Sequence, residues 1–202
     1  MERVIAYVDG YNLYYGLRSK GWKRFYWLNI QQLIQQLLKP DQTLSGVKYF
    51  TTVVNQPEDR RRRQQTFLDA LHTLRDFQIF YGQFLAETIK CRNCGHTYTT
   101  YHEKMTDVNI SVELIQDAFQ DKFDTAFLVS ADSDLVPPIK TVQNIFKSKK
   151  IVAVFPPGRV SYALKQNANG FIHIGRSELA KSIFPERVDR NGVILRKPLG
   201  WK

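Results

Sequence analysis

The sequence predicts a three-layer α/β/α sandwich with a mainly parallel sheet and right-handed crossovers. Short apolar runs of strand length alternate with longer stretches of helical period along the chain. One run, Thr125–Val129, is apolar throughout, as in a strand that is buried on both faces of a parallel sheet. The chain has 202 residues, 43% of them hydrophobic, which suits one α/β core and not two. We therefore expect one domain over residues 1–184, an insertion near residues 86–102, and a basic C-terminal tail over residues 185–202.

Each predicted strand is a short apolar or β-branched run bounded by turn residues. The first, Arg3–Val8, ends in Asp9, and Gly10 and Asn12 then form a tight turn into a helix. The other five strands, in chain order, are Val47–Val54, Phe77–Leu85, Thr125–Val129, Ile151–Phe155 and Phe171–Ile174.

The segments between these strands carry apolar residues at helical spacing. The helix before the fourth strand is expected to begin near Asp107, which sits in its first turn. Its buried stripe is predicted to consist of Val108, Val112, Ile115 and Phe119. In chain order, the predicted helices are Leu13–Leu17, Leu28–Leu38, Glu58–Asp76, Thr106–Phe119, Leu135–Phe146, Val160–Asn167 and Arg176–Ile183.

The chain is strongly basic, with 29 Lys and Arg against 19 Asp and Glu and a net charge of +10. This charge favours an anionic partner such as RNA, although a merely soluble basic protein has the same composition. Gly21–Trp27 alternates aromatic and basic residues that could stack bases or cap the core. The run Arg60–Arg63 fits a solvated helix face or an RNA contact. The tail over residues 185–202 is a basic arm for RNA or a poorly ordered terminus.

No apolar run reaches the length of a membrane span, so no membrane partner is expected. Asp9 interrupts the early apolar segment, which argues against a signal peptide. We therefore expect a cytoplasmic protein.

Acidic residues follow the strands at the edge where open α/β sheets place ligands. Asp9 ends the first strand, Asp132 and Asp134 follow the fourth, and Asp107 opens the helix between. If the first and fourth strands are neighbours, these four acids lie close together at the carboxyl edge of the sheet. Carboxylates without His or Cys suit Mg²⁺ or Mn²⁺, which could hold an RNA phosphate and activate water. Asn12 could orient a water or a phosphate oxygen, and Ser130 could support a carboxylate. Taken singly, each Asp could equally be a helix cap or a turn residue.

Three motifs lie within the stretch from roughly Arg3 to Ile174: VDGYN around Asp9, EKMTD ending at Asp107, and SADSD from Ser130 to Asp134. In sequence, order and spacing they resemble the NYN domains of the PIN-like nuclease superfamily, in particular the bacterial LabA-like (DUF88) group. The resemblance implies a PIN-like (Rossmann-like) fold and a metal-dependent ribonuclease. It implies that the four aspartates bind Mg²⁺ or Mn²⁺, supported by Asn12 and Ser130. One departure is Asn169, where such proteins often carry an acid.

Two other classes of function remain open. A non-catalytic RNA-binding or regulatory module could retain the acidic metal site as a scaffold. A phosphatase of the haloacid dehalogenase type ranks third, because Tyr11 stands where that class needs a second Asp.

Cys91 and Cys94 form a CxxC motif that looks like half of a zinc ribbon. A structural Zn²⁺ needs further ligands, which could be His96 and His102 or the knuckle of a second subunit in a homodimer. A metal-free turn is the main alternative, and a redox pair is the last, because the motif does not open a helix after a strand.

Overall fold

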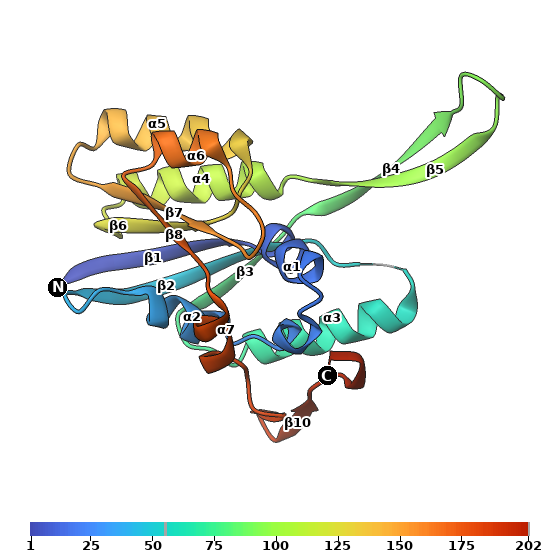
Figure 1. Cartoon of the computed structure of the whole chain (residues 1–202), viewed down its shortest axis with the longest axis horizontal. Helices are drawn as coiled ribbons and strands as arrows, with labels where there is room; N and C mark the ends of the chain where they lie inside the picture. The colour runs from blue at the N-terminus through green and yellow to red at the C-terminus, as the bar shows by residue number, and fades with distance from the viewer. Residues whose placement is uncertain (55, 202) are drawn as a thin grey trace.

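A computed structural model describes residues 1–54 and 56–201, with the side chains of residues 85–87 and 100–103 outside the description. A six-stranded sheet in the order β3-β2-β1-β6-β7-β8 forms its centre (Figure 1). Every neighbouring pair in this sheet is parallel, which confirms the predicted class of fold. The strands are β1 (Glu2–Asp9), β2 (Gln42–Thr51), β3 (Phe77–Tyr81), β6 (Thr125–Val129), β7 (Lys150–Phe155) and β8 (Gly170–His173).

Helices cover both faces of the sheet (Figure 1). One face carries α4 (Thr106–Phe119), α5 (Val136–Ile145) and α6 (Tyr162–Asn167). The other carries α1 (Gly10–Ser19), α2 (Ile30–Leu37), α3 (Glu58–Leu71) and α7 (Arg176–Lys181). Successive side chains of β1 point to opposite faces, so Val4, Ala6 and Val8 join one hydrophobic cluster while Ile5 and Tyr7 join the other. Among the described residues, no helix is long and apolar enough to cross a membrane.

The stripe predicted for α4 is wrong except at Ile115, which is half-buried against the core. Val108, Val112 and Phe119 are 60%, 53% and 62% exposed, whereas Ile110, Leu114 and Ala118 are buried against the sheet. Asp117 lies on the same buried face, where its carboxylate contacts Lys48 Nζ of β2 at 2.5 Å and accepts a hydrogen bond from Tyr7 Oη of β1 at 2.7 Å. A count of apolar residues does not place Asp117 on this face, because its partners lie on distant strands.

The predicted strand Phe77–Leu85 is also too long. The sheet strand stops at Tyr81, and β4 (Gln83–Lys90) and β5 (Thr97–Lys104) form a separate antiparallel hairpin. This hairpin extends away from the sheet as an arm and contains the predicted insertion (Figure 1).

The segment predicted as a tail carries ordered elements up to residue 201. After residue 185 come β9 (Arg187–Arg190) and β10 (Val193–Arg196), which pair antiparallel, and a 3₁₀ turn η3 (Leu199–Trp201). Arg190 forms an ion pair with Asp69 of α3, and Trp201 packs on Phe67 with ring centroids 6.0 Å apart. These two contacts place the C-terminal segment on α3.

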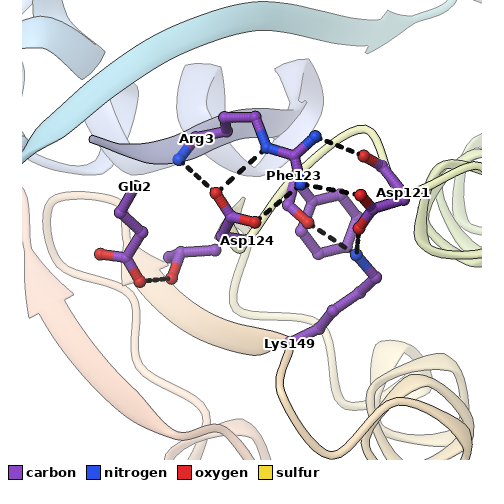
Figure 2. A network of polar contacts seen from close by, with 7 residues as sticks. Glu2, Arg3, Asp121, Phe123, Asp124 and Lys149 are labelled. Atoms are coloured by element: carbon purple, nitrogen blue, oxygen red, sulfur yellow. Dashed lines mark hydrogen bonds and ion pairs between the residues drawn. The ribbon is translucent and has the colours of Figure 1, made fainter.

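Charged residues at the amino ends of the strands form a network on the sheet edge remote from the candidate site (Figure 2). Arg3 donates to Asp124 and to Asp121, and Lys149 donates to Asp121 and to the Phe123 carbonyl. Hydrogen bonds from the Arg3 side chain and backbone lower the pKa of Asp124 to about 2. The network therefore ties the starts of β1, β6 and β7 together while Asp121 and Asp124 stay ionised.

Asn169, the position that departs from the resembled pattern, lies at this amino edge as well. Its Oδ1 accepts from the Ile151 amide at 2.8 Å and from Gln143 Nε2 at 3.0 Å. Asn169 therefore joins the starts of β7 and β8, away from the acids at the carboxyl edge.

Candidate acidic site at the carboxyl edge of the sheet

The site forms at the point where the strand order reverses. Strands β1 and β6 are neighbours, with Val8 opposite Val129, and the chain leaves them toward opposite faces of the sheet. After β1 the chain enters α1, and after β6 it enters the 3₁₀ turn η2 (Ser133–Leu135) and α5. The two connections diverge at the strand ends, which is the place where doubly wound folds bind ligands.

Asp9 lies at this switch point and is only 2% exposed. Its Oδ1 accepts from the Asn12 amide at 2.9 Å, so Asp9 is the N-cap of α1. Its Oδ2 accepts from Asn12 Nδ2 at 2.5 Å and from Ser130 Oγ at 3.0 Å. Three donors therefore fix the orientation of one buried carboxylate.

Gly10 allows α1 to begin directly at the strand end. A Cβ at this position would lie 2.5 Å from Tyr49 Oη and 2.8 Å from the Phe50 carbonyl oxygen. The close approach of α1 to β2 therefore requires glycine after Asp9.

Ser130 links the two acidic motifs. It is fully buried, donates to Asp9, and accepts from the Asp132 amide at 3.1 Å. Asp132 Oδ1 in turn accepts from the Asp134 amide at 3.0 Å and caps η2. Asp132 is half-buried and Asp134 is exposed.

Asp107 lies in the first turn of α4, which packs against β1 and η2. Met105 precedes this helix with φ of 78°, a left-handed conformation that turns the chain from the arm into α4. Asp107 is half-buried, and its carbonyl accepts from Ser111 Oγ at 2.7 Å. The helix therefore starts on the same side of the fold as Asp9 and Asp132.

The donor set suits a hard divalent cation, because Asp9 and Asp132 offer carboxylate oxygens and Ser130 and Asn12 orient Asp9. Mg²⁺ often binds through one or two carboxylates and keeps several waters. In the described part of the chain, no three Asp, Glu, His or Cys side chains gather closely enough to form a complete metal site. The candidate site is thus a pair of acids joined by a serine, with Asp107 and Asp134 on flanking elements.

Sequence reasoning missed Arg159, which contacts Asn12 beside the acids. Arg159 lies in the connection between β7 and α6, and its Nη1 donates to Asn12 Oδ1 at 2.6 Å. The same Asn12 oxygen accepts from the Ala131 amide at 3.4 Å. Asn12 therefore joins the connections after β1, β6 and β7, and it brings a cation to the acids. The PPGR sequence offered no motif that would have revealed this.

A cleft of about 830 Å³ starts beside Asp9 at Gly10 and Tyr11. We call it the aromatic cleft. Its cationic lining residues are Arg18, Lys23, Arg60 and Arg63, and none of the described residues that line it is acidic. Its aromatic lining residues are Tyr11, Tyr14, Tyr15, Phe25, Tyr26, Tyr49, Phe67, Phe84 and Trp201.

The structure divides the aromatic and arginine runs between the core, surface ion pairs and the cleft wall. Phe25 and Trp27 are fully buried core residues, whereas Tyr26 is half-buried on the cleft wall. Arg62 and Arg63 pair with acids one helical turn earlier, and Arg60 and Arg63 line the cleft.

Cys91 and Cys94 lie at the tip of the arm in a tight knuckle. The Gly95 amide donates to the Cys91 carbonyl at 2.9 Å, and the Cys91 amide donates to the His96 carbonyl at 2.7 Å. Hydrogen bonds from the Cys94 and Asn93 amides, and from the Cys94 side chain, lower the pKa of the Cys91 thiol. Both thiols are free, and the side chain of His102 lies outside the described part.

The parallel sheet and the acids at its switch point define an α/β protein of the PIN-like class. The NYN domain family matches residues 3–175, and the chain belongs to this family, within the PIN-like nuclease superfamily. The chain also resembles a solved Vibrio parahaemolyticus protein of unknown function, with a TM-score of 0.60 and 20% identity over 91% of this chain and 96% of that one. That likeness supports the fold alone.

One curated relative is the 6-hydroxy-3-succinoylpyridine 3-monooxygenase HspA of Pseudomonas putida. It is 23% identical over 240 residues, which cover 98% of this chain and 75% of the relative. At this identity, the activity in its name is not carried to this chain.

Proposed function

We propose that this protein is a metal-dependent ribonuclease that hydrolyses phosphodiester bonds of RNA at the carboxyl edge of its sheet. The observation that carries the proposal is the buried Asp9 carboxylate, held by Asn12 and Ser130 at the switch point between β1 and β6. Membership of the NYN family and a net charge of +10 support a nuclease that acts on a polyanion.

Asp9 and Asp132 are the proposed direct ligands of Mg²⁺ or Mn²⁺, and Asp107 and Asp134 contribute from the flanking elements. Such an ion would lower the pKa of a bound water and neutralise charge on the phosphate. Ser130 and Asn12 hold the Asp9 carboxylate in place. Arg159 contacts Asn12 and so holds a guanidinium near the acids, where its remaining N–H groups could donate to phosphate oxygens.

The test compares the wild-type chain with Asp132→Asn and Asp41→Asn on labelled single-stranded RNA in Mg²⁺, Mn²⁺ or EDTA. We expect cleavage only with the divalent ion and a loss of at least roughly 100-fold in Asp132→Asn, because direct ligands matter more than their supporting partners. Asp41 is an exposed acid just before β2, so Asp41→Asn controls for a general change of charge.

Equal cleavage by all three proteins would identify a contaminating nuclease. Salt-sensitive RNA binding without turnover in either ion would instead support the non-catalytic RNA-binding module.

The knuckle at the tip of the arm is proposed to bind a structural Zn²⁺ through Cys91 and Cys94. Backbone amides that stabilise the Cys91 thiolate favour metal binding, since the thiolate is the ligand. We expect zinc in protein purified from zinc-replete medium and its loss in Cys94→Ser, measured by elemental analysis and native mass spectrometry. Zinc-free wild-type protein would contradict this.

The same mass spectra identify the remaining ligands. A homodimer that dissociates on chelation would place the knuckles of two chains on one ion. A zinc-bound monomer would direct the search to the histidines of the arm.

A further inference from the structure

A row of aromatic rings runs along the aromatic cleft from the acidic site to the C-terminal segment. Tyr11 lies 5.9 Å from Tyr15, which lies 5.3 Å from Tyr14, measured between ring centroids. Tyr14 lies 5.1 Å from Tyr26, and Tyr26 lies 5.8 Å from Trp201. The row therefore begins two residues from Asp9 and ends on η3.

These rings are only partly buried in the hydrophobic core. Tyr14 and Tyr15 are 40% and 41% exposed, and Tyr26 and Trp201 are half-buried. Trp201 is held from behind by Trp27 at 6.3 Å and Phe67 at 6.0 Å. Partly exposed rings on a fixed support can stack on an incoming planar group without a large ordering cost.

The charge of the aromatic cleft indicates which kind of planar ligand it can bind. Arg18 lies 5.7 Å from the centre of the Tyr15 ring, and Lys23 and Arg60 line the same space. Because the described lining includes no acid, an anionic ligand is favoured. A chain that alternates planar bases with phosphates satisfies both the rings and the cations.

Part of this wall lies outside the NYN match. The match ends at residue 175, whereas Gly200 and Trp201 line the cleft from η3. Hairpin β9–β10 holds this segment on α3 through the Arg190–Asp69 ion pair. The family core thus supplies the acids, and the C-terminal segment supplies part of the wall of the cleft that begins beside Asp9.

We propose that the aromatic cleft binds a single-stranded segment of the RNA substrate, with its bases stacked on Tyr15, Tyr14, Tyr26 and Trp201. The proposal rests on the proposed function for the identity of the substrate. Trp201 is a positioning residue that seats the strand beyond the cleavage point. Because stacking on side chains requires free base faces, a duplex binds less tightly than a single strand.

The test measures binding alone, by fluorescence anisotropy of a short labelled single-stranded RNA in EDTA. In full-length chains, Trp201→Ala and Tyr14→Ala are each expected to weaken binding roughly 5- to 150-fold, the range for loss of one stacked base. Trp201→Phe should retain most of the affinity. Tyr162→Ala is the matched control, because Tyr162 is 79% exposed on α6 and lies outside the cleft.

A second readout tests the cations. Arg18→Gln should reduce the slope of log Kd against log salt concentration by about 0.7, the value for one phosphate contact on a single strand. Thermal unfolding checks that each variant is folded, and Tyr14→Ala tests the cleft even if Trp201→Ala disturbs its packing.

Wild-type affinity in both Tyr14→Ala and folded Trp201→Ala would overturn the inference, as would absence of RNA binding by the wild-type chain or equal affinity for a duplex. The binding assay involves neither a metal ion nor turnover, so weakened binding in these variants supports RNA binding by the cleft even if the protein cleaves no RNA. An absence of cleavage would refute only the ribonuclease proposal.

Discussion

Asp9→Asn is expected to reduce RNA cleavage at least roughly 100-fold, the upper range for loss of a group that only supports a metal ligand. The amide can still cap α1 by accepting from the Asn12 amide, so the helix should survive. The substitution removes the negative charge and turns a donor toward Asn12 Nδ2 or Ser130 Oγ. Initial rates of cleavage in Mg²⁺ and Mn²⁺, together with thermal unfolding, measure both effects.

Ser130→Ala provides a graded comparison for Asp9→Asn. It removes the donor to Asp9 and the acceptor for the Asp132 amide while leaving both carboxylates in place. We expect a loss of roughly 10- to 100-fold. If Asp9→Asn were as active as the wild-type chain, the buried carboxylate would be a helix cap and nothing more.

Asp117→Ala is expected to destabilise the fold by about 3–5 kcal/mol, because it removes one of the two carboxylates that balance the buried Lys48 charge and also the acceptor of the buried Tyr7 hydroxyl. Lys48 and Asp117 are 8% and 0% exposed at their side chains, and Glu113 also contacts Lys48, at 2.6 Å. For a chain of this length the loss corresponds to a fall in Tm of roughly 6–20 °C. Thermal and urea unfolding at neutral pH measure it.

The double variant Lys48→Met with Asp117→Leu is the control for this ion pair. Replacing both charges with apolar groups is often neutral, but Glu113 and the Tyr7 hydroxyl lose their partners, so the double variant should recover only part of the lost stability. Lys122→Ala, which removes an exposed partner of Asp117, should cost only about 0–1 kcal/mol. A double variant no more stable than Asp117→Ala would contradict the role given to the Lys48 charge.

The same ion pair makes the free energy of unfolding depend on pH in the acid range. Burial opposes the charged form of Asp117, but hydrogen bonds from Lys48 and Tyr7 and the charge of Lys48 outweigh it and lower the pKa of Asp117. Its contribution is complete above the unfolded value of about 3.9 and is lost as the pH falls through the lowered folded pKa. The difference between wild type and Asp117→Ala should therefore shrink in strong acid.

Local sequence signals identified the elements that their own residues determine. Apolar runs such as Thr125–Val129 are strands because little else buries a short continuous apolar segment, and this prediction matches β6 residue for residue. The acids were recognised because parallel strands end at a common edge. This argument placed Asp9 and Asp132 together before any contact was known, and Ser130 joins them as the predicted support.

Features that depend on contacts between distant residues were not predicted from the sequence. Asp117 belongs to the buried face of α4 because it meets Lys48, 69 residues earlier in the chain, and no local apolar pattern registers that pairing. Arg159 reaches Asn12 only because β7 lies beside β6.

The sequence by itself determined the class of fold, the order of strands and helices, and the acids that define the candidate site, because each rests on local periodicity and on strand ends. Only the tertiary structure decided that β4 and β5 form an arm, that Asn169 contacts Ile151 and Gln143, and that Gly200 and Trp201 line the aromatic cleft. The physical reason is that these features are contacts between segments far apart in the chain. Trp201 forms part of the wall of the aromatic cleft by packing against Tyr26 and Phe67, and no local pattern around Trp201 encodes those two contacts.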